Sequence, residues 1–281
     1  MTRLDHGAVG FTPSSVAFQA FADLTSQAGW LAEWQPELAV GSVLLEGGVV
    51  MYVPVPDMPA LCRHLLENIP ATWSFAVVVA LPPAQAAPLL SPHRLDWARH
   101  ASVVPMQPCW TLMGITDAPQ PVLGWDLARP PAGPLAWVLR NDARPGRANV
   151  PGRAHWVAHA RSGWSRRHLE QPAAWVQQQM QAALAECLGQ PIDWHHCVVH
   201  RWRYALPQAH ATAPAASFWW DAACGLGVCA DFLGGCGVEG AWLSAQALSA
   251  ALRRPASDVA DAATAYAAPE ASLSASRRLA A

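Results

Sequence analysis

The chain has 281 residues, 52% of them hydrophobic, and a formal net charge of −2. That length is enough for one large or two modest domains, and the charge balance excludes a broad basic face for nucleic acid. All 18 basic residues are arginine, which excludes chemistry that depends on a lysine, such as a Schiff base or a P-loop phosphate site.

The first half of the chain alternates helical and strand-like patterns. Residues 13–35 place apolar side chains three and four residues apart, which predicts an amphipathic helix that Ser14 or Ser15 caps and Gly29 ends. Further along we expect a hairpin, a helix, a strand and a broken helical stretch. These lie at 41–55 (turning at Gly47 and Gly48), 58–69, 73–83 and 84–101.

The most apolar of these segments is the stretch at 75–81. It is a continuous, valine-rich run that two prolines follow. Such a run is typical of a strand that is covered on both faces, so we expect a central strand beside the strand at 226–230.

The second half predicts strands followed by a long helix, and then a final strand and helix. The expected strands are at 106–115, 133–142, 154–160, 195–206 and 226–231, and the expected helices are at 172–189 and 238–253. Residues 254–281 are rich in Ala and Ser and have little to bury, which predicts a disordered tail. The interleaving of strands and helices indicates an α/β or mixed α+β fold.

Nothing in the sequence predicts export or membrane insertion. Asp5 and His6 lie where a signal peptide needs an apolar core, and prolines interrupt the longest apolar run. The seven cysteines are odd in number and form no C-x-x-C pair, which fits reduced thiols. We therefore expect a soluble cytoplasmic protein without a membrane partner.

A glycine-rich turn joins the last strand to the last helix. Asp231 ends the expected strand, and the helix begins near Val238. The glycines of this turn are Gly234, Gly235, Gly237 and Gly240. Backbone N–H groups at a helix start are unpaired and attract anions, and glycines let a ligand approach the backbone closely. The pattern predicts a cofactor or phosphate site, while a tight turn before a helix explains the same residues without a ligand.

Histidines and aromatic residues suggest two further kinds of site. The histidines at metal-like spacing are His155 with His159 and, around Cys197, His195, His196 and His200. No complete ligand set converges from this spacing, so we expect no metal. Trp110, Trp202 and Tyr204 are candidates for the walls of an apolar pocket, and ordinary core packing is the alternative.

Segments in order along residues 3–253 resemble one family. HRWRYALP (200–207) and GLGVCADFLGGCGVEGAWLSAQALSAALR (225–253) are similar to the C-terminal end of renalase-like FAD-dependent oxidoreductases, which belong to the flavin amine-oxidase superfamily. Earlier segments that resemble this family are RLDHGAVGFTPSSVAFQAF, VPDMPALCRHLLENI, VVVALPPAQAAPLL, PMQPCWTLM, RNDARPGR and GWSRRHLE.

The resemblance implies an FAD site at the glycine turn. Asp231 would contact the ribityl chain or the pyrophosphate, and the backbone of Val238, Glu239 and Gly240 would face the pyrimidine edge of the flavin. The other implied cofactor contacts are Gly235 and the segment Asp5, Gly7 and Ala8 beside the isoalloxazine ring. The implied substrate pocket contains Trp110, His200, Trp202 and Tyr204.

The resemblance also implies two domains before the tail. A Rossmann-like FAD-binding domain would comprise 1–12, 53–92 and 200–253, and an inserted sheet-and-helix substrate domain would comprise 13–52 and 93–199. Relatives begin with a strand, a G-x-G-x-x-G loop and a helix that bind the ADP half of FAD. We expect the FAD-binding domain to be truncated, because this unit is missing and only 70–74 stand where relatives carry a hairpin.

The implied activity is transfer of a hydride from a reduced nicotinamide-like or amine substrate to the flavin, and then to oxygen. A small-molecule substrate is the expected partner, and the sequence indicates no oligomeric state and no catalytic acid or base. The alternative is a degenerate, non-catalytic relative that no longer binds FAD, which the missing ADP unit favours. A module that binds a small molecule in the aromatic pocket is a third, weaker hypothesis.

Overall fold

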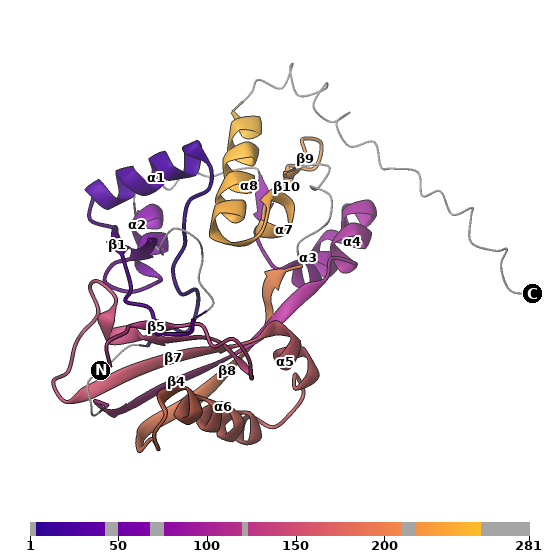
Figure 1. Cartoon of the computed structure of the whole chain (residues 1–281). Coiled ribbons are helices and arrows are strands. Elements are labelled where there is room, and N and C mark those ends of the chain that lie inside the picture. Colours follow the sequence, from indigo (N-terminus) through magenta and orange to yellow (C-terminus); the bar gives the residue numbers. More distant parts are fainter. Residues whose placement is uncertain (1–3, 43–49, 68–75, 120–122, 209–216, 254–281) are drawn as a thin grey trace, which may run out of the picture.

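The computed structural model describes residues 4–42, 50–67, 76–119, 123–208 and 217–253. The expected hairpin turn at Gly47 and Gly48, the connection at 70–74 and the tail at 254–281 lie outside the described residues. Within the described part the strands form three separate sheets of two, three and five strands (Figure 1). None of its helices is both long and apolar enough to cross a membrane.

The largest sheet is antiparallel and has the strand order β5-β6-β7-β4-β8. Its strands are β4 (Met106–Asp117), β5 (Leu127–Ala128), β6 (Leu135–Arg140), β7 (Arg153–Ala160) and β8 (Trp194–Pro207). A single turn, η1 (Asn141–Ala143), follows β6, and α5 (Ser162–Arg167) and α6 (Ala173–Leu188) cover one face (Figure 1). Leu112 and Trp156 of the sheet pack there with Met180 of α6, and all three side chains are fully buried.

The opposite face of this sheet packs against a small antiparallel pair of strands, β1 (Leu31–Trp34) and β2 (Met51–Pro54). Met113 and Val157 contact Trp34 and Val53 in this second core. Two helices accompany the pair, α1 (Val16–Gln27) and α2 (Ala60–Glu67). One part of this face is therefore apolar and covered by β1 and β2. The rest of the face lies outside this core.

The three-stranded sheet contains β3 (Val77–Val79), β10 (Leu226–Val228) and β9 (Trp219–Asp221), in that order across the sheet. β10 is parallel to β3 and antiparallel to β9. The surrounding helices are α3 (Pro83–Leu90), α4 (Leu95–Ser102), α7 (Asp231–Gly234) and α8 (Gly237–Leu252). Side chains from α3, α4, α7 and the three strands share one core, and Leu248 of α8 lies against Gly227 of β10, so the sheet and its helices form one packed unit.

A two-stranded ribbon joins the two larger sheets. β4 and β8 continue past the five-stranded sheet toward α3 and α4 (Figure 1), where Met106 is in register with Pro207. The register shifts between Gln107 and Cys109, at Pro108, whose ring nitrogen has no hydrogen to donate to the ladder. The ribbon therefore contains a local break in its hydrogen bonding.

The structure differs from the sequence prediction after the first helix. That helix begins as predicted, since the Ser15 hydroxyl accepts from the Phe18 N–H, and it ends at Gln27, just before the predicted stop at Gly29, but the unpredicted strand β1 follows. Gly29 has a φ of +75°, a conformation that turns the chain out of the helix. Residues 31–34 then pair with β2, because that pairing buries Leu31 and Trp34.

The prediction of a central strand at 75–81 is half right. β3 does pair with β10, as expected. It is not covered on both faces: among the described strands it lies at the edge of its sheet, and Val77 and Val78 are 64% and 45% exposed. A valine-rich strand is usually covered on both faces by other elements, but the described part of the chain does not cover these two side chains.

Candidate functional site

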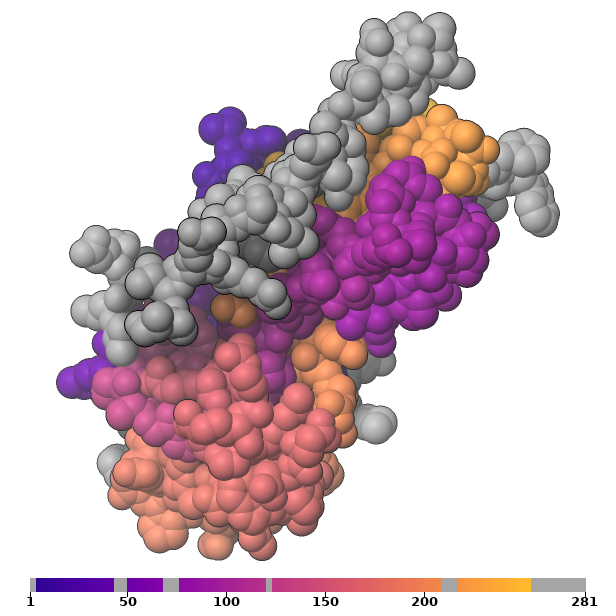
Figure 2. Space-filling model, turned by 90° about the vertical axis from the view of Figure 1, so that its right-hand side faces the viewer, coloured from indigo at the N-terminus to yellow at the C-terminus, as the bar shows by residue number. Residues whose placement is uncertain are grey.

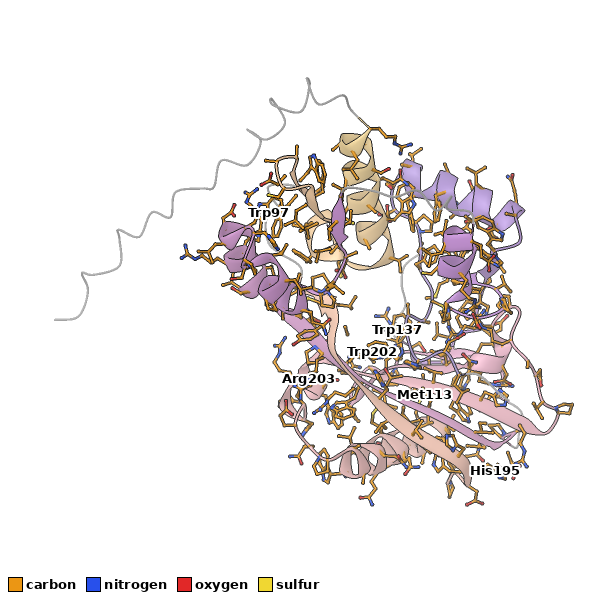
Figure 3. All side chains as sticks on the ribbon, turned by 180° about the vertical axis from the view of Figure 1, so that it is seen from behind. Trp97, Met113, Trp137, His195, Trp202 and Arg203 are labelled. Atoms are coloured by element: carbon orange, nitrogen blue, oxygen red, sulfur yellow. The ribbon has the colours of Figure 1, made fainter. Side chains whose placement is uncertain are left out.

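A row of four side chains crosses this face of the five-stranded sheet at the margin of the apolar core, against which Trp137 packs. Trp137 of β6 is in register with His159 of β7, His159 with Thr111 of β4, and Thr111 with His200 of β8. Residues in cross-strand register point to the same face of a sheet, so these four side chains lie side by side. Figure 3 shows Trp137 and, two residues along β8 from His200, Trp202 on this side of the sheet.

The N-terminal segment lies against this row. The Trp202 Nε1 donates a hydrogen bond to the His6 carbonyl oxygen at 3.1 Å. The ring centroids of His6 and Trp202 are 5.2 Å apart, those of His6 and His200 are 5.0 Å apart, and those of His200 and Trp202 are 4.5 Å apart. The three rings therefore form one aromatic cluster between the segment and β8.

Two buried arginines hold the N-terminal segment in place. Arg147 pairs with the buried Asp5 carboxylate at 2.6 Å, and the Met58 N–H donates to the same carboxylate. Arg144 donates to the carbonyl oxygens of Ala8 and Val9. Burial lowers the pKa of Arg144 to about 10, so it remains a cation at neutral pH. Asp5 is thus a structural partner of Arg147, while the backbone beside Gly7 stays open.

His159 is neutral at this place. Burial, together with the positive charge of Arg144, lowers the pKa of His159 to about 4. Its Nε2 is buried without a hydrogen-bond partner among the described residues, and so is the Nδ1 of His6. Buried polar atoms usually have partners, so the unpaired nitrogens of His6 in the cluster and of His159 in the row mark a place where a polar ligand would be accommodated.

The glycine turn lies at the C-terminal end of β8, where the Cys236 thiol contacts the Pro207 carbonyl oxygen at 3.8 Å. The prediction that Asp231 ends the last strand is wrong. Strand β10 ends at Val228, and Asp231 begins the short helix α7 three residues later. Its half-buried carboxylate has no side-chain partner in the described part of the chain. Burial raises the pKa of Asp231, and the backbone N–H of Phe232 opposes this shift only partly.

The glycines of this turn are explained by close packing of the backbone. A Cβ on Gly240 would lie 1.4 Å from the Gly235 carbonyl oxygen, and a Cβ on Gly234 would lie 2.1 Å from the Gly240 carbonyl oxygen. The turn therefore folds directly onto the first turn of α8. Gly235 and Gly237 have φ of +108° and +81°, which are conformations that favour glycine.

The Glu239 side chain connects α8 to α1. Its carboxylate accepts hydrogen bonds from the backbone N–H groups of Ser14 and Ser15, both at 2.8 Å, and from the Ser14 hydroxyl at 2.7 Å. Burial alone would raise the pKa of Glu239, but the hydrogen bonds from Ser15 and Ser14 outweigh it and lower the pKa. The carboxylate is thus occupied by hydrogen bonds from the N-terminal end of α1. Only the backbone of 238–240 is left for a ligand to contact.

Replacing Glu239 by glutamine is expected to cost about 1–2 kcal/mol of stability, because the hydrogen bonds that it accepts lose the charge of the carboxylate. The lowered pKa means that the carboxylate stabilises the fold fully above its ordinary pKa and loses this effect as the pH falls through the lowered value. Urea unfolding at pH 7 and at pH 3.5 measures both effects. Equal losses at the two pH values would contradict this role, because at pH 3.5 the carboxylate is protonated in the unfolded chain and part of its stabilising effect is lost.

The structure brings together only some of the predicted site residues. His200 and Trp202 lie in the aromatic cluster, and Gly7 and Ala8 lie beside it. Trp110 is buried under the opposite face, where its Nε1 donates to the His168 carbonyl oxygen. The site residues that sequence reasoning missed are His6, Thr111, Trp137 and the unpaired nitrogen of His159.

No protein-family model matches the chain. Among solved structures, it is similar to an oxidoreductase from Methanosarcina mazei, with a TM-score of 0.52 and 16% identity over 73% of this chain and 56% of that one. It is also similar, with TM-scores of 0.48 and 0.45, to a provisionally named protoporphyrinogen oxidase from Exiguobacterium sp. 255-15 and to an FAD dependent oxidoreductase from Pseudomonas aeruginosa.

These last two likenesses have 15% and 17% identity and cover 62% and 79% of this chain. They cover 40% and 69% of the Exiguobacterium and Pseudomonas chains. The chain thus spans about half the length of the first two proteins, 40% and 56%. The Methanosarcina likeness shows a shared mixed α/β fold, which is the fold of a protein described as an oxidoreductase.

Proposed function

We propose that the chain is a flavin-dependent oxidoreductase that holds the flavin end of FAD between the glycine turn and the aromatic cluster. The observation that carries this proposal is the cluster itself: the rings of His6, His200 and Trp202 pack together, with His6 stacked on Trp202, and the unpaired nitrogens of His6 and His159 are buried there. Planar aromatic surfaces stack on such rings, and the nitrogens offer hydrogen bonds to a heteroaromatic edge.

The residues present fit the flavin end of the cofactor. Asp231 offers a half-buried carboxylate without a side-chain partner in the described part, which suits the hydroxyls of a ribityl chain. Helix α8 starts at Gly237 without a side-chain cap, so its positive end is available to the electron-rich pyrimidine edge. The open backbone beside Gly7 leaves room for a planar ring.

The ADP end has no comparable fit within the described residues. In α/β sheets that bind a dinucleotide, a glycine loop after a parallel strand holds the pyrophosphate. Of the two parallel strands here, β10 leads to the glycine turn assigned to the flavin end, and β3 is followed by Pro82 and Pro83. The exposed side chains of Val77 and Val78 also leave that side of the sheet uncovered. We therefore assign to this chain only the contacts with the flavin and the ribityl chain.

The chemistry that a bound FAD would supply is acceptance of a hydride from a reduced nicotinamide-like or amine substrate, followed by reoxidation by oxygen. The protein's part is electrostatic and steric. Arg144 and the start of α8 both favour negative charge nearby, and His159 remains uncharged because of its low pKa. Trp202 and Trp137 make the sheet side of the site apolar.

A second candidate function is a non-catalytic relative that no longer binds FAD. The backbone packing among Gly234, Gly235 and Gly240 favours it, because these glycines are required by the fold with or without a ligand. The two candidates differ in whether any flavin binds at all.

Titration of the purified chain with riboflavin, FMN, FAD and ADP, followed by flavin fluorescence and by calorimetry for ADP, tests the proposal. If the chain holds only the flavin end, the three flavins will bind with similar, weak affinity and ADP will not compete. Competition by ADP would contradict the assignment of contacts, and no binding by any flavin would favour the non-catalytic candidate.

Variants locate the site in the same experiment. Asp231→Asn is expected to weaken the binding of each flavin about tenfold or more, the effect of losing a hydrogen bond to a charged group. Asp193→Asn, at an exposed position at the start of β8, is the matched control and is expected to change nothing. Equal affinities in both variants would remove Asp231 from the site.

A further inference from the structure

A pocket of about 260 Å³ lies beside the ribbon that joins the two larger sheets. It opens next to the interruption of the ladder at Pro108, between helix α3, the paired ends of β4 and β8, and the region of α5. In Figure 2 the orange end of β8 is visible between the purple surface of α3 and α4 and the salmon surface below it. This place is separate from the aromatic cluster around His6.

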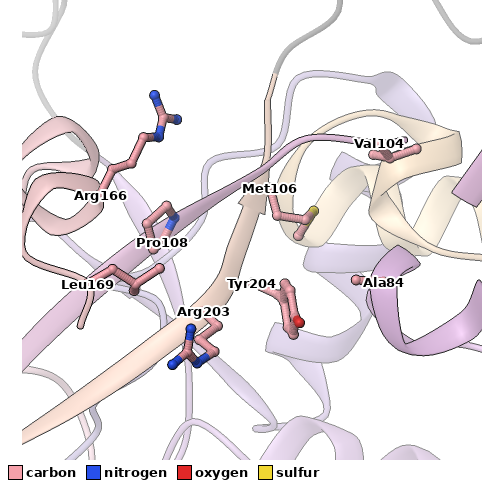
Figure 4. Close-up of a pocket in the computed structure, with 8 residues that line it drawn as sticks. All are labelled: Ala84, Val104, Met106, Pro108, Arg166, Leu169, Arg203 and Tyr204. Carbon is pink, nitrogen blue, oxygen red and sulfur yellow. The ribbon is translucent and has the colours of Figure 1, made fainter. Parts of the chain in front are cut away.

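The lining divides into an apolar end and a cationic end (Figure 4). Ala84, Val104 and Met106 form the apolar end, whereas Pro108 and Leu169 lie at the other end, beside the arginines. The two charged residues of the lining are Arg166 of α5 and Arg203 of β8, and the ring of Tyr204 lies between the two ends.

The charges around the cationic end do not balance. Glu170 is the carboxylate that pairs here, and it is shared by Arg203 at 2.6 Å and Arg201 at 3.0 Å. Arg166 has no ion-pair partner within the described part of the chain. The pocket lining and its ion pairs thus include three arginines and one carboxylate, which leaves a net positive charge at this end of the pocket.

We propose that this pocket binds a small amphipathic monocarboxylate, with its carboxylate at Arg166 and Arg203 and its hydrocarbon part against Met106, Val104 and Ala84. A guanidinium is matched in shape and charge to a carboxylate, and Arg166 has its donors available. The volume lies just below the roughly 300–1,000 Å³ of drug-sized sites, so the ligand is a short acid rather than a long-chain lipid.

Calorimetric titration of the full chain with octanoate, below its micellar concentration, tests this proposal. Octan-1-ol and octylammonium are the matched probes, since they keep the chain and change only the charge of the head group. We expect octanoate to bind with a stoichiometry of one, octanol to bind at least about tenfold more weakly, and octylammonium not to bind. No binding of octanoate, or equal binding of octanol, would overturn the proposal.

Variants place the site at the pocket. Arg166→Gln and Arg203→Gln are each expected to weaken octanoate binding about tenfold or more. Arg167→Gln is the matched control, because Arg167 is an exposed arginine on the same helix that does not line the pocket. An equal loss in the Arg167 variant would show that octanoate responds only to overall charge, and would overturn the site.

The exposed Ala84 gives a variant that keeps every charge. Ala84→Phe is expected to fill the apolar end and to abolish octanoate binding, while the melting temperature stays close to that of the wild type. Undiminished binding in this variant would contradict the proposed position of the hydrocarbon part.

Discussion

Replacing Gly240 by alanine is expected to destabilise the protein by about 3 kcal/mol or more, the upper end of the cost of overpacking. An ideal Cβ at this position would lie 1.4 Å from the carbonyl oxygen of Gly235 and 2.1 Å from its carbonyl carbon. Both atoms belong to backbone, which cannot rotate out of the way as a flexible side chain would. The turn must therefore separate from α8, and its packing onto the start of the helix is lost.

Urea unfolding followed by circular dichroism measures this loss as a shift of the midpoint. Gly163→Ala is the matched control, because a Cβ at Gly163 of α5 has no atom within 4 Å. That variant is expected to be neutral or slightly more stable, since alanine is the better helix former. If Gly240→Ala unfolds at the same midpoint as the wild type, the turn does not pack against α8 as described.

Removing the Asp5 carboxylate is expected to cost about 3–5 kcal/mol, because it leaves Arg147 buried and unpaired. The two side chains are only 6% and 4% exposed and form their ion pair at 2.6 Å. Asp5→Ala and Arg147→Met should each have a large effect. The double variant should lose less than the sum of the two, because the second change removes the charge that the first left unpaired.

The ion pair of Asp117 with Arg153 is the control for this prediction. It has the same separation of 2.6 Å, but its side chains are 71% and 38% exposed. Asp117→Ala should therefore cost less than about 1 kcal/mol. Equal effects of Asp5→Ala and Asp117→Ala in thermal unfolding would mean that the Asp5 carboxylate is reached by water.

The elements that were predicted well are those in which the local pattern decides the structure. Helix α6 ends at Gly189, which has a φ of +68°, and strands β4, β7 and β8 follow their runs of apolar and aromatic residues. Strand β1 was missed because its residues continue the spacing of the preceding helix. The exposure of β3 was missed because a run of valines indicates how much cover a strand needs, not whether a neighbour supplies it.

The candidate site depends on register, which spacing along the chain does not reveal. His159 and His155 were considered together because they are four residues apart in sequence. The neighbours that give His159 its place are Thr111 and Trp137, each on a different strand. In the sequence His6 is only a polar residue near the N-terminus, whereas in the structure its ring completes the cluster with His200 and Trp202.

Any bending between the two larger sheets would be concentrated at one place in the ribbon of β4 and β8. Two hydrogen-bonded strands resist bending together, so the softest point of the ribbon is at Pro108, where the ladder is interrupted. A small rotation at this joint would be magnified along the nine residues from Trp202 to the far end of β8 at Trp194. A molecule wedged beside Pro108 would stiffen the joint and fix the tilt of one sheet relative to the other.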